Sequence, residues 1–429
     1  MVVALVGIAG VLASARADAI PAFARKTGMG CPACHESWPK LNDFGELYRD
    51  RGYRIREEGA EGLMDRSLDY FPVTLRTSVG YQFASMSHQA NDAGDRTVQT
   101  GAFLSPAADL IFGTPLSDHA SVFVVATGFA NDGLVNLESA WARINTIGTT
   151  WFNLKVGRHE LDLPVSEHRS YTLTAPFLIY HYHPGGGTNT FAIGDNQLGI
   201  EVMGHGEGPG LRYAVSIMSA SGNPGSDAAL SSPALYGHLT WTMLPWSPIL
   251  TRVRVGLVAD IGWAPTVFQT LTPMGGMPAP VPGTGTNHKG FGHIGGEVQA
   301  TLGPLAAPLS VTAVWLYGQE PAELVPNGIQ DGEFHGGFIE VDWTPRLPMT
   351  FFFRFDDVSN IQQADPTQPV NSNGQNAFSF GARHAIWLSP WGSMAGHLEV
   401  SSVNTENAAA TPTNPVRATT VFAGLDFAI

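Results

Sequence analysis

The only two cysteines of the 429-residue chain lie close together, in the run Cys31-Pro32-Ala33-Cys34-His35. Two thiols at this spacing can add to the two vinyl groups on one edge of a porphyrin. A histidine directly after the second cysteine can then reach over the ring as the proximal ligand of the iron. The pattern therefore predicts one covalently bound c-type haem, attached through Cys31 and Cys34, with His35 as the proximal ligand.

Two other kinds of site use cysteines at this spacing. A redox-active dithiol would use Cys31 and Cys34 without needing His35. A structural zinc site would need further cysteine or histidine ligands close by, and none follows nearby in the sequence. Because both cysteines lie inside one motif, no disulfide framework and no other cysteine-based metal site is expected in the chain.

The sixth position of the haem iron has several candidate ligands. Met29 lies too close to the cysteines to reach the opposite face of the ring. Met64 is far enough along the chain to fold back, and Met86, His88 or a histidine from elsewhere could also serve. The choice matters because ligation by histidine and methionine raises the reduction potential relative to other pairs.

The first residues resemble an export signal, which suits a haem that is attached outside the cytoplasm. An apolar run from Val2 to Leu12 is followed by Ala17-Asp18-Ala19, a small-x-small cleavage site. We expect residues 1–19 to be removed. The charged region that usually opens such a signal is missing, so the sequence leaves open whether the true start lies upstream of Met1.

An amphipathic helix is predicted from Ser37 to Arg51, directly after the haem motif. Large apolar side chains recur there at spacings of three and four: Trp38, Leu41, Phe44, Leu47 and Tyr48. They could wall the haem against water. The same region is basic, either as a solvated face or to balance the haem propionates, through Arg25, Lys26, Lys40, Arg49, Arg51, Arg54 and Arg56.

Composition narrows the class of protein. Charged residues make up only 14% of the chain, against about 25% in an average soluble protein. No later stretch approaches the roughly 18 consecutive apolar residues of a membrane helix. The formal net charge of −14 argues against nucleic acid as a partner, because phosphate binding favours a basic surface.

From about Tyr70 the sequence alternates with a period of two, which predicts β-strands. In one segment Val253, Val255, Leu257 and Ile261 alternate with Arg252, Arg254 and Asp260. In another, Phe351, Phe353 and Phe355 alternate with Phe352, Arg354 and Asp356. One face of each strand is therefore apolar, and the charged face is expected to line a wet interior.

About 16 such segments can be counted, and an even number is typical of a transmembrane barrel. They begin near Val73, Val98, Asp118, Leu134, Thr149, Asn196, Gly210, Pro233, Thr251, Phe291, Pro308, Gly332, Pro348, Gln375, Ser393 and Val416.

The connections alternate between long and short, apart from a short third one near Asn131–Gly133. The long ones lie near 86–96, 162–195, 222–232, 264–290, 320–331, 359–374 and 405–415. Barrels of the outer membrane have long loops outside and short turns on the periplasmic side.

The fold class predicted is therefore all-β: a transmembrane antiparallel β-barrel of about 16 strands with a small N-terminal α-helical haem segment. The last strand, ending at Ile429, should close the barrel against the first. We expect residues 20–69 to form the haem segment and residues 70–429 the barrel. A soluble β-sandwich or β-propeller is the alternative, but it gives no reason for connections that alternate in length.

The long loop from Asp162 to Asp195 carries a second group of potential ligands. It contains His168, His181 and His183, with acidic residues near its start. The His-x-His pair could bind a metal ion, and the alternative is a polar gating loop. No phosphate-binding loop, nucleophile elbow or catalytic triad is recognisable.

The N-terminal sequence resembles the opening of the outer-membrane monohaem cytochrome c–porin fusions of iron-oxidising bacteria. The matching residues are Ile20–Gly28, Cys31–His35, Trp38–Asn42, Phe44-Gly45 and Gly52-Tyr53, with a second similar segment at Gly157–Pro164 and Glu167–Arg169. The resemblance implies that the haem segment plugs or caps the barrel. It also implies extracellular Fe(II) as the donor.

These observations together lead us to expect an electron-transfer protein of the bacterial outer membrane, standing in a lipid bilayer, with Fe(II) oxidase as the candidate enzymatic activity. Electrons would pass from extracellular Fe(II) through one haem c to a periplasmic c-type cytochrome. Two rival functions stay open: outward transfer to an extracellular acceptor, and a passive solute porin with a haem-bearing plug.

Overall fold

The protein is described by a computed structural model. It covers residues 21–37, 39–55, 72–87, 98–104, 108–117, 119–128, 136–184, 192–219, 233–245, 247–271, 279–283, 285, 287–303, 307–325, 328–346, 348–365, 373–389, 391–406 and 416–429. The expected export signal, residues 1–19, lies outside these ranges, as do Met64 and His88.

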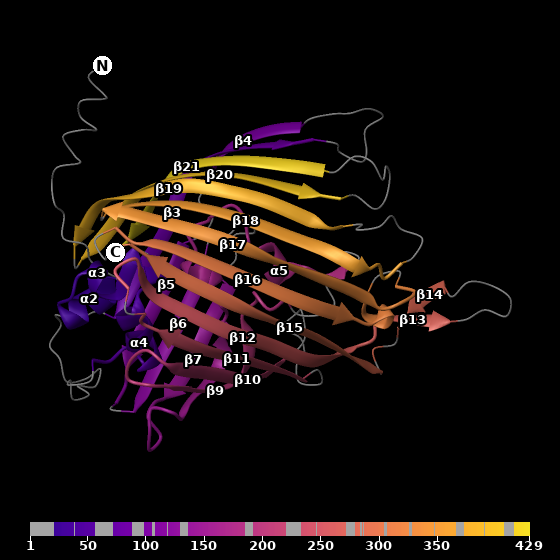
Figure 1. Cartoon of the computed structure of the whole chain (residues 1–429), viewed down its shortest axis with the longest axis horizontal. Helices are drawn as coiled ribbons and strands as arrows, with labels where there is room; N and C mark the ends of the chain where they lie inside the picture. The colour runs from indigo at the N-terminus through magenta and orange to yellow at the C-terminus, as the bar shows by residue number, and fades with distance from the viewer. Residues whose placement is uncertain are drawn as a thin grey trace.

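An antiparallel β-barrel makes up most of the described chain (Figure 1). Its strands are β3 (Val73–Met86), β4 (Val98–Leu104), β5 (Ala108–Pro115), β6 (Ala120–Gly128), β7 (Asn136–Ile144), β8 (Asn153–His159), β9 (Gln197–His205), β10 (Leu211–Ser219), β11 (Pro233–Met243), β12 (Leu250–Pro265), β15 (His288–Leu302), β16 (Leu309–Glu320), β17 (Gly332–Arg346), β18 (Met349–Gln362), β19 (Gln375–Ser389), β20 (Gly392–Thr405) and β21 (Val416–Ala428).

The barrel is closed, as the sequence predicts. β21 pairs with β3 from Ala428 opposite Arg76 to Ala418 opposite Met86. β4 pairs with the second half of β3 and β5 with the first half, so these two segments share one place in the ring. The seventeen strand segments described thus fill 16 positions, which confirms the predicted fold class.

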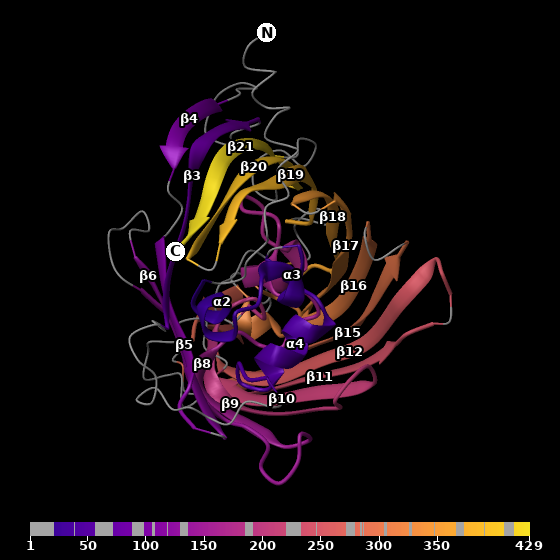
Figure 2. The ribbon, with the colours of Figure 1, turned by 90° about the vertical axis from the view of Figure 1, so that its left-hand side faces the viewer.

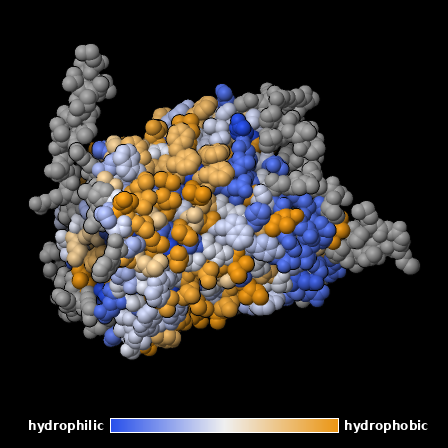
Figure 3. Space-filling view, viewed as in Figure 1, coloured by the Kyte–Doolittle hydropathy of each residue, from blue (hydrophilic) through white to orange (hydrophobic). Residues whose placement is uncertain are grey.

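The two faces of the strands differ in the way that the alternation predicts. In β12 Val255, Leu257 and Ile261 are exposed on the outside, whereas Arg252 and Asp260 are buried on the inside. An apolar exterior covers the middle of the barrel wall (Figure 3). Such a surface is stable in the hydrocarbon core of a bilayer and costly in water.

Apart from 129–135 between β6 and β7, the strand connections are short at one end of the barrel and long at the other (Figure 1). The short ones include 145–152, 206–210 and 347–348. The long connection 266–287 carries a hairpin of its own, β13 (Phe268–Leu271) with β14 (Ala279–Pro282). By the rule for outer-membrane barrels, the end with short connections faces the periplasm.

Residues 21–37 and 39–55, here called the N-terminal plug, lie within the ring of strands (Figure 2). The plug contains α2 (Pro21–Thr27), α3 (Cys31–Cys34), the small hairpin of β1 (His35–Ser37) and β2 (Lys40–Leu41), and α4 (Asp43–Asp50). Arg25 stacks over Trp391 in a short turn, so the plug sits at the periplasmic end. No helix in the described ranges is long and apolar enough to cross a bilayer.

The predicted helix from Ser37 to Arg51 is wrong at its start. The chain forms β1 and β2 first, and the helix begins only at Asp43. Pro39 lies in the turn between the two short strands, where it has no backbone N–H to donate. Asn42 then caps the helix, because its side chain accepts a hydrogen bond of 2.9 Å from Gly45 N.

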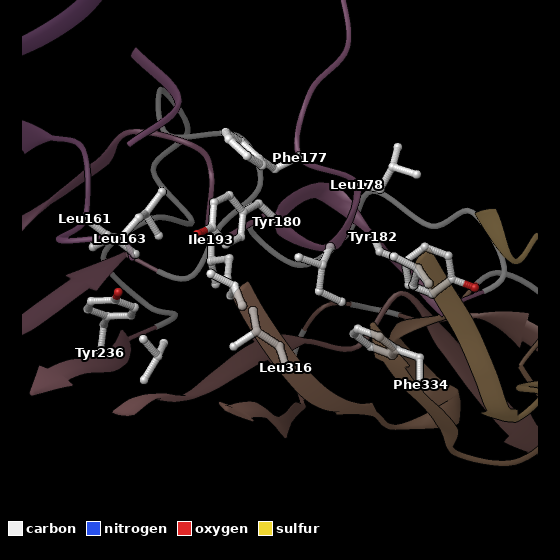
Figure 4. Packing of buried hydrophobic residues seen from close by; sticks show 14 of the residues in the cluster. Leu161, Leu163, Phe177, Leu178, Tyr180, Tyr182, Ile193, Tyr236, Leu316 and Phe334 are labelled. Carbon is white, nitrogen blue, oxygen red and sulfur yellow. The ribbon is translucent and has the colours of Figure 1, made fainter. Parts of the chain in front are cut away.

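Part of the connection between β8 and β9, residues 160–184 and 192–196, folds into the lumen and is here called the inner loop. It carries a short helix, α5 (Leu178–His181), and an apolar cluster packs it against inward-facing residues of the wall (Figure 4). Phe177 lies 4.4 Å from Phe338 between ring centroids. The interior is therefore partly filled by protein, which the expectation of a wet lumen did not foresee.

Candidate functional site

Ion pairs fix the N-terminal plug to the barrel wall. Asp50 of α4 is 2% exposed and lies 2.7 Å from the guanidinium of Arg212 on β10. Glu46, one turn earlier, pairs with Arg254 of β12, and Lys40 pairs with Asp342 of β17. These contacts reach β10, β12 and β17, which lie along one arc of the ring, so the plug is fixed against that part of the wall.

An aromatic stack adds a second anchor. The ring of Phe23 in α2 stacks on Tyr53 at 4.4 Å between centroids. Tyr53 in turn stacks on Phe123 of β6 at 5.6 Å, and Phe123 on Trp141 of β7 at 5.4 Å. The stack continues from the plug into the wall, beside the haem motif, because Cys34 packs against the same cluster.

His35 has the arrangement of a histidine prepared to bind a metal. It is 7% exposed, and its Nδ1 lies 3.1 Å from the carbonyl oxygen of Pro39. A carbonyl can only accept, so Nδ1 carries the hydrogen and Nε2 keeps its lone pair. Burial lowers the pKa of His35 to about 4, which keeps the ring neutral near pH 7. Neutral imidazole is the form that ligates iron.

Cys34 is poorly suited to thiol–disulfide exchange in the folded chain. Its side chain is half-buried at the edge of the plug, and burial raises the pKa of the thiol to about 11. Reactive dithiols have a lowered pKa instead. The raised pKa therefore weighs against the redox-dithiol alternative for Cys34.

Cys34 and His35 open onto a cavity between the plug, the barrel wall and the inner loop. It measures about 1400 Å³, counting the part that is continuous with solvent. Apolar side chains from all three parts line it, among them Phe23, Leu41, Tyr48, Ile111, Phe123, Val125 and Leu161. An apolar lining of this kind suits the body of a porphyrin ring.

Basic side chains also border this cavity, and most of them come from the barrel and the inner loop. They are Arg49, Arg76, Arg143, Lys155, Arg169 and Arg212. Arg143 donates 3.0 Å to the carbonyl of Arg49 and so joins the wall to the plug. The sequence left open whether the basic residues of the plug are solvated or balance haem propionates. Of these residues, Arg49 borders the cavity, whereas Lys40 pairs with Asp342. No local pattern in the sequence indicated that distant strands would place basic side chains around this cavity.

Candidate sixth ligands can now be placed. Met86 ends β3 with its side chain exposed, and it is not among the cavity residues. The lining does contain two histidines, His159 at the end of β8 and His168 in the inner loop. Sequence reasoning did not single out His159, although the glycine two residues before it was a visible signal of a bend.

The histidines predicted as a second metal site do not converge on one point. His181 Nε2 lies 2.8 Å from Glu167, and His183 Nδ1 lies 3.0 Å from Glu320 on β16. Each imidazole has a carboxylate of its own. Within the described part of the chain, no group of three or more such side chains is placed to hold a metal ion.

Gly45 sets how closely α4 approaches the haem motif. A Cβ at this position would lie 1.9 Å from the carbonyl oxygen of Cys34. We expect Gly45→Ala to push α4 away from Cys34 and His35 and to lower the yield of covalent haem severalfold, measured by haem staining per folded barrel. Gly208→Ala, where a Cβ meets nothing within 4 Å, is the control. A normal haem content in Gly45→Ala would contradict this.

Glu46 makes the docking of the plug depend on pH. Burial alone would raise its pKa, but Arg254 and Arg252 lower it from 4.5 to about 2. The stability from this group is therefore complete above about pH 4.5 and is lost as the pH falls towards 2. We expect protease sensitivity of the plug to rise over that window, and Glu46→Gln to be sensitive already at neutral pH. Equal pH profiles for both proteins would contradict this.

Comparison with known proteins identifies solved structures whose fold is similar to that of the barrel. No family model matches the chain, and no curated protein matches it. Among solved structures, the anion-selective porin from Comamonas acidovorans is similar with a TM-score of 0.50 and 13% identity, over 83% of this chain and 99% of that one. The outer-membrane channel DcaP of Acinetobacter baumannii follows with a TM-score of 0.47 and 11% identity, over 82% and 96%. The barrel of this chain therefore has the fold of a porin.

Proposed function

We propose that the chain is an outer-membrane electron-transfer protein of the monohaem cytochrome c–porin type. It takes electrons from extracellular Fe(II) through one c-type haem and passes them to a periplasmic c-type cytochrome. Each Fe(II) gives up one electron and becomes Fe(III), and one ferric acceptor cytochrome becomes ferrous. The proposal joins the haem motif to the porin fold and places the protein in the bacterial outer membrane.

The observation that carries the proposal is the position of His35 and Cys34. Both border one cavity inside the barrel, with the Nδ1 of His35 held by Pro39 and its Nε2 left to bind iron. Cys31 and Cys34 would hold a haem covalently, and His35 would ligate its iron. A haem bound there would supply a one-electron redox centre.

The residues around the cavity have distinct roles in this proposal. Phe23, Tyr48 and Leu41 would exclude water from the ring. Arg143, which donates to backbone carbonyls of the plug rather than to a carboxylate, would balance a propionate. Exclusion of water and fixed ligands both reduce the reorganisation that accompanies a change of iron charge. The ion pairs of Asp50 and Lys40 keep the plug at one depth, and so fix the redox centre relative to the two mouths.

The two ends of the barrel suit different reaction partners. The plug lies at the end with short connections, which faces the periplasm by the barrel rule, and there a soluble cytochrome could dock close to the haem. The long connections surround the other mouth, where Fe(II) would arrive. A barrier about 25 Å tall separates the two solutions, and soluble carriers cannot cross it.

The passive-porin function draws support from the fold, but the inner loop weighs against it. Phe177, Tyr180 and Tyr182 pack against Phe334 and Phe338 of the wall, within a large apolar cluster. A channel for polar solutes needs a polar, open lumen. We therefore expect low conductance from the intact protein in planar bilayers.

Anaerobic addition of Fe(II) to the oxidised, detergent-purified protein tests the proposal. The α-band of reduced haem should appear within minutes, and a periplasmic-type cytochrome c added afterwards should remove it. A haem potential well below that of the available Fe(II)/Fe(III) couple would favour outward transfer instead. No reduction by Fe(II), together with a high open-channel conductance, would favour the passive porin.

A further inference from the structure

His159 is a buried histidine with one ring nitrogen that nothing in the described protein satisfies. It ends β8 and is 1% exposed. Its Nε2 has no hydrogen-bond partner and lies 3.8 Å from the nearest carboxylate oxygen, on Glu201. A buried polar atom without a partner is costly, and one explanation is that this nitrogen binds a ligand. His159 lines the same cavity as His35.

A backbone carbonyl fixes the tautomer of His159 in the same way as that of His35. Its Nδ1 lies 3.0 Å from the carbonyl oxygen of Gly157, so Nδ1 carries the hydrogen and Nε2 keeps the lone pair. Gly157 has φ +131°, and a Cβ there would lie 2.2 Å from the carbonyl oxygen of Ala140. The bend that orients this carbonyl therefore requires glycine.

Glu201 does not compete strongly for His159. Its other oxygen lies 2.7 Å from Lys155 Nζ, and Ser216 donates to the carboxylate at 3.3 Å. The carboxylate is thus compensated from the barrel wall. The nitrogen that faces it at 3.8 Å stays outside hydrogen-bonding distance.

Both ring nitrogens of the other candidate in the cavity, His168, already have partners. His168 Nδ1 lies 3.0 Å from Glu138, and its Nε2 lies 3.4 Å from the side-chain oxygen of Asn196. Its side chain is also 34% exposed. Binding iron through His168 would break its existing contacts. Binding iron through His159 would instead give a partner to a ring nitrogen that has none among the described residues.

We propose that His159 Nε2 is the distal axial ligand of the haem iron, so that His35 and His159 hold the iron between the plug and the barrel wall. The inference rests on the proposed function, because it needs the haem. In this arrangement β8 supplies a haem ligand as well as part of the barrel wall. The redox centre is therefore complete only when the plug is docked in the barrel. It also implies a lower reduction potential than histidine and methionine together would give.

Spectroscopy of detergent-purified variants with covalent haem tests the assignment without using iron oxidation. The native ferric protein should be low-spin and its ferrous form should not bind CO. His159→Ala should keep one haem per chain but become high-spin and bind CO stoichiometrically. Added imidazole should restore the low-spin spectrum.

The control is His205→Ala on β9. His205 is 4% exposed and its Nδ1 makes the same kind of bond, 2.8 Å to the carbonyl of Gly206, but it is not among the cavity residues. Its spectrum should match the native one. If His159→Ala does not fold, His159→Met should still retain a sixth ligand and raise the potential.

Two results would overturn the assignment. One is a low-spin, CO-inert His159→Ala protein, and the other is a high-spin spectrum produced by His168→Ala instead. A native protein that carries no covalent haem would refute the proposed function itself and the ligand assignment with it. These failures are distinguishable, because haem content and spin state are measured separately.

Discussion

Replacing Cys31 and Cys34 together by serine should remove all covalent haem while the barrel still folds. Serine hydroxyls do not form thioethers with the porphyrin, so haem staining and the α-band should both disappear. The barrel should persist because its closure depends on strand pairing, such as β21 with β3, and not on the plug. Heat-modifiable mobility on gels measures the folded barrel, and haem staining measures the cofactor.

Ala33→Ser is the matched control for this experiment. It introduces a serine inside the same short helix and leaves both thiols in place. We expect a haem content close to that of the native protein. Covalent haem at full level in the double serine variant would show that the motif does not attach it.

A large loss of plug docking is expected when Asp50 is replaced. Asp50→Ala removes the buried carboxylate that the half-buried Arg212 and Arg49 share, although Arg212 keeps its pair with Asp162 of the inner loop. Burial alone would raise the pKa of Asp50, yet the two guanidinium groups hold it well below its usual range. Removing one partner of a buried ion pair costs about 3–5 kcal/mol. Because Arg212 keeps Asp162, we expect a loss at the lower end of this range, about 3 kcal/mol, in the free energy that docks the plug.

Protease cleavage of the plug at rising urea concentration measures that free energy, while gel mobility reports whether the barrel is intact. The matched control is Asp43→Ala in the same helix. Asp43 also pairs with a barrel arginine, Arg252, but its side chain is 49% exposed. A pair of this kind contributes about 1 kcal/mol or less. Equal loss in both variants would show that burial of the Asp50 pair does not decide docking.

The strands could be predicted closely because their pattern is local. β11, β17, β19 and β21 begin at the residues expected from the alternation of apolar and polar side chains. A barrel strand meets lipid on one face and the lumen on the other, so each second residue reports the fold directly. The alternating lengths of the connections also predicted which end of the barrel faces the periplasm.

The helix after the haem motif was misplaced because two signals competed. Apolar spacing from Trp38 to Tyr48 suited a helix, but Pro39 and the cap at Asn42 delay its start to Asp43. The apolar residues before the cap lie on a short hairpin or outside the described residues. Capping chemistry decided the boundary, and periodicity alone did not include it.

The site depended on contacts between residues far apart in the chain, which the sequence does not display. Arg212 joins Asp50 of the plug to Asp162 of the inner loop, and His159 reaches the cavity only because β8 passes beside the plug. Cys34 and His35 were predictable because they are neighbours. The wall that completes their site was not, since it is assembled by barrel closure.

Transfer of electrons across a sealed membrane tests the central claim most directly. The haem-loaded protein is reconstituted into lipid vesicles that enclose an oxidised c-type cytochrome, and Fe(II) is added outside without oxygen. We predict that the trapped cytochrome becomes reduced, and that vesicles with the Cys31→Ser, Cys34→Ser barrel behave like empty ones. A trapped cytochrome that stays oxidised, or one that is reduced equally well by the haem-free barrel, would contradict the account.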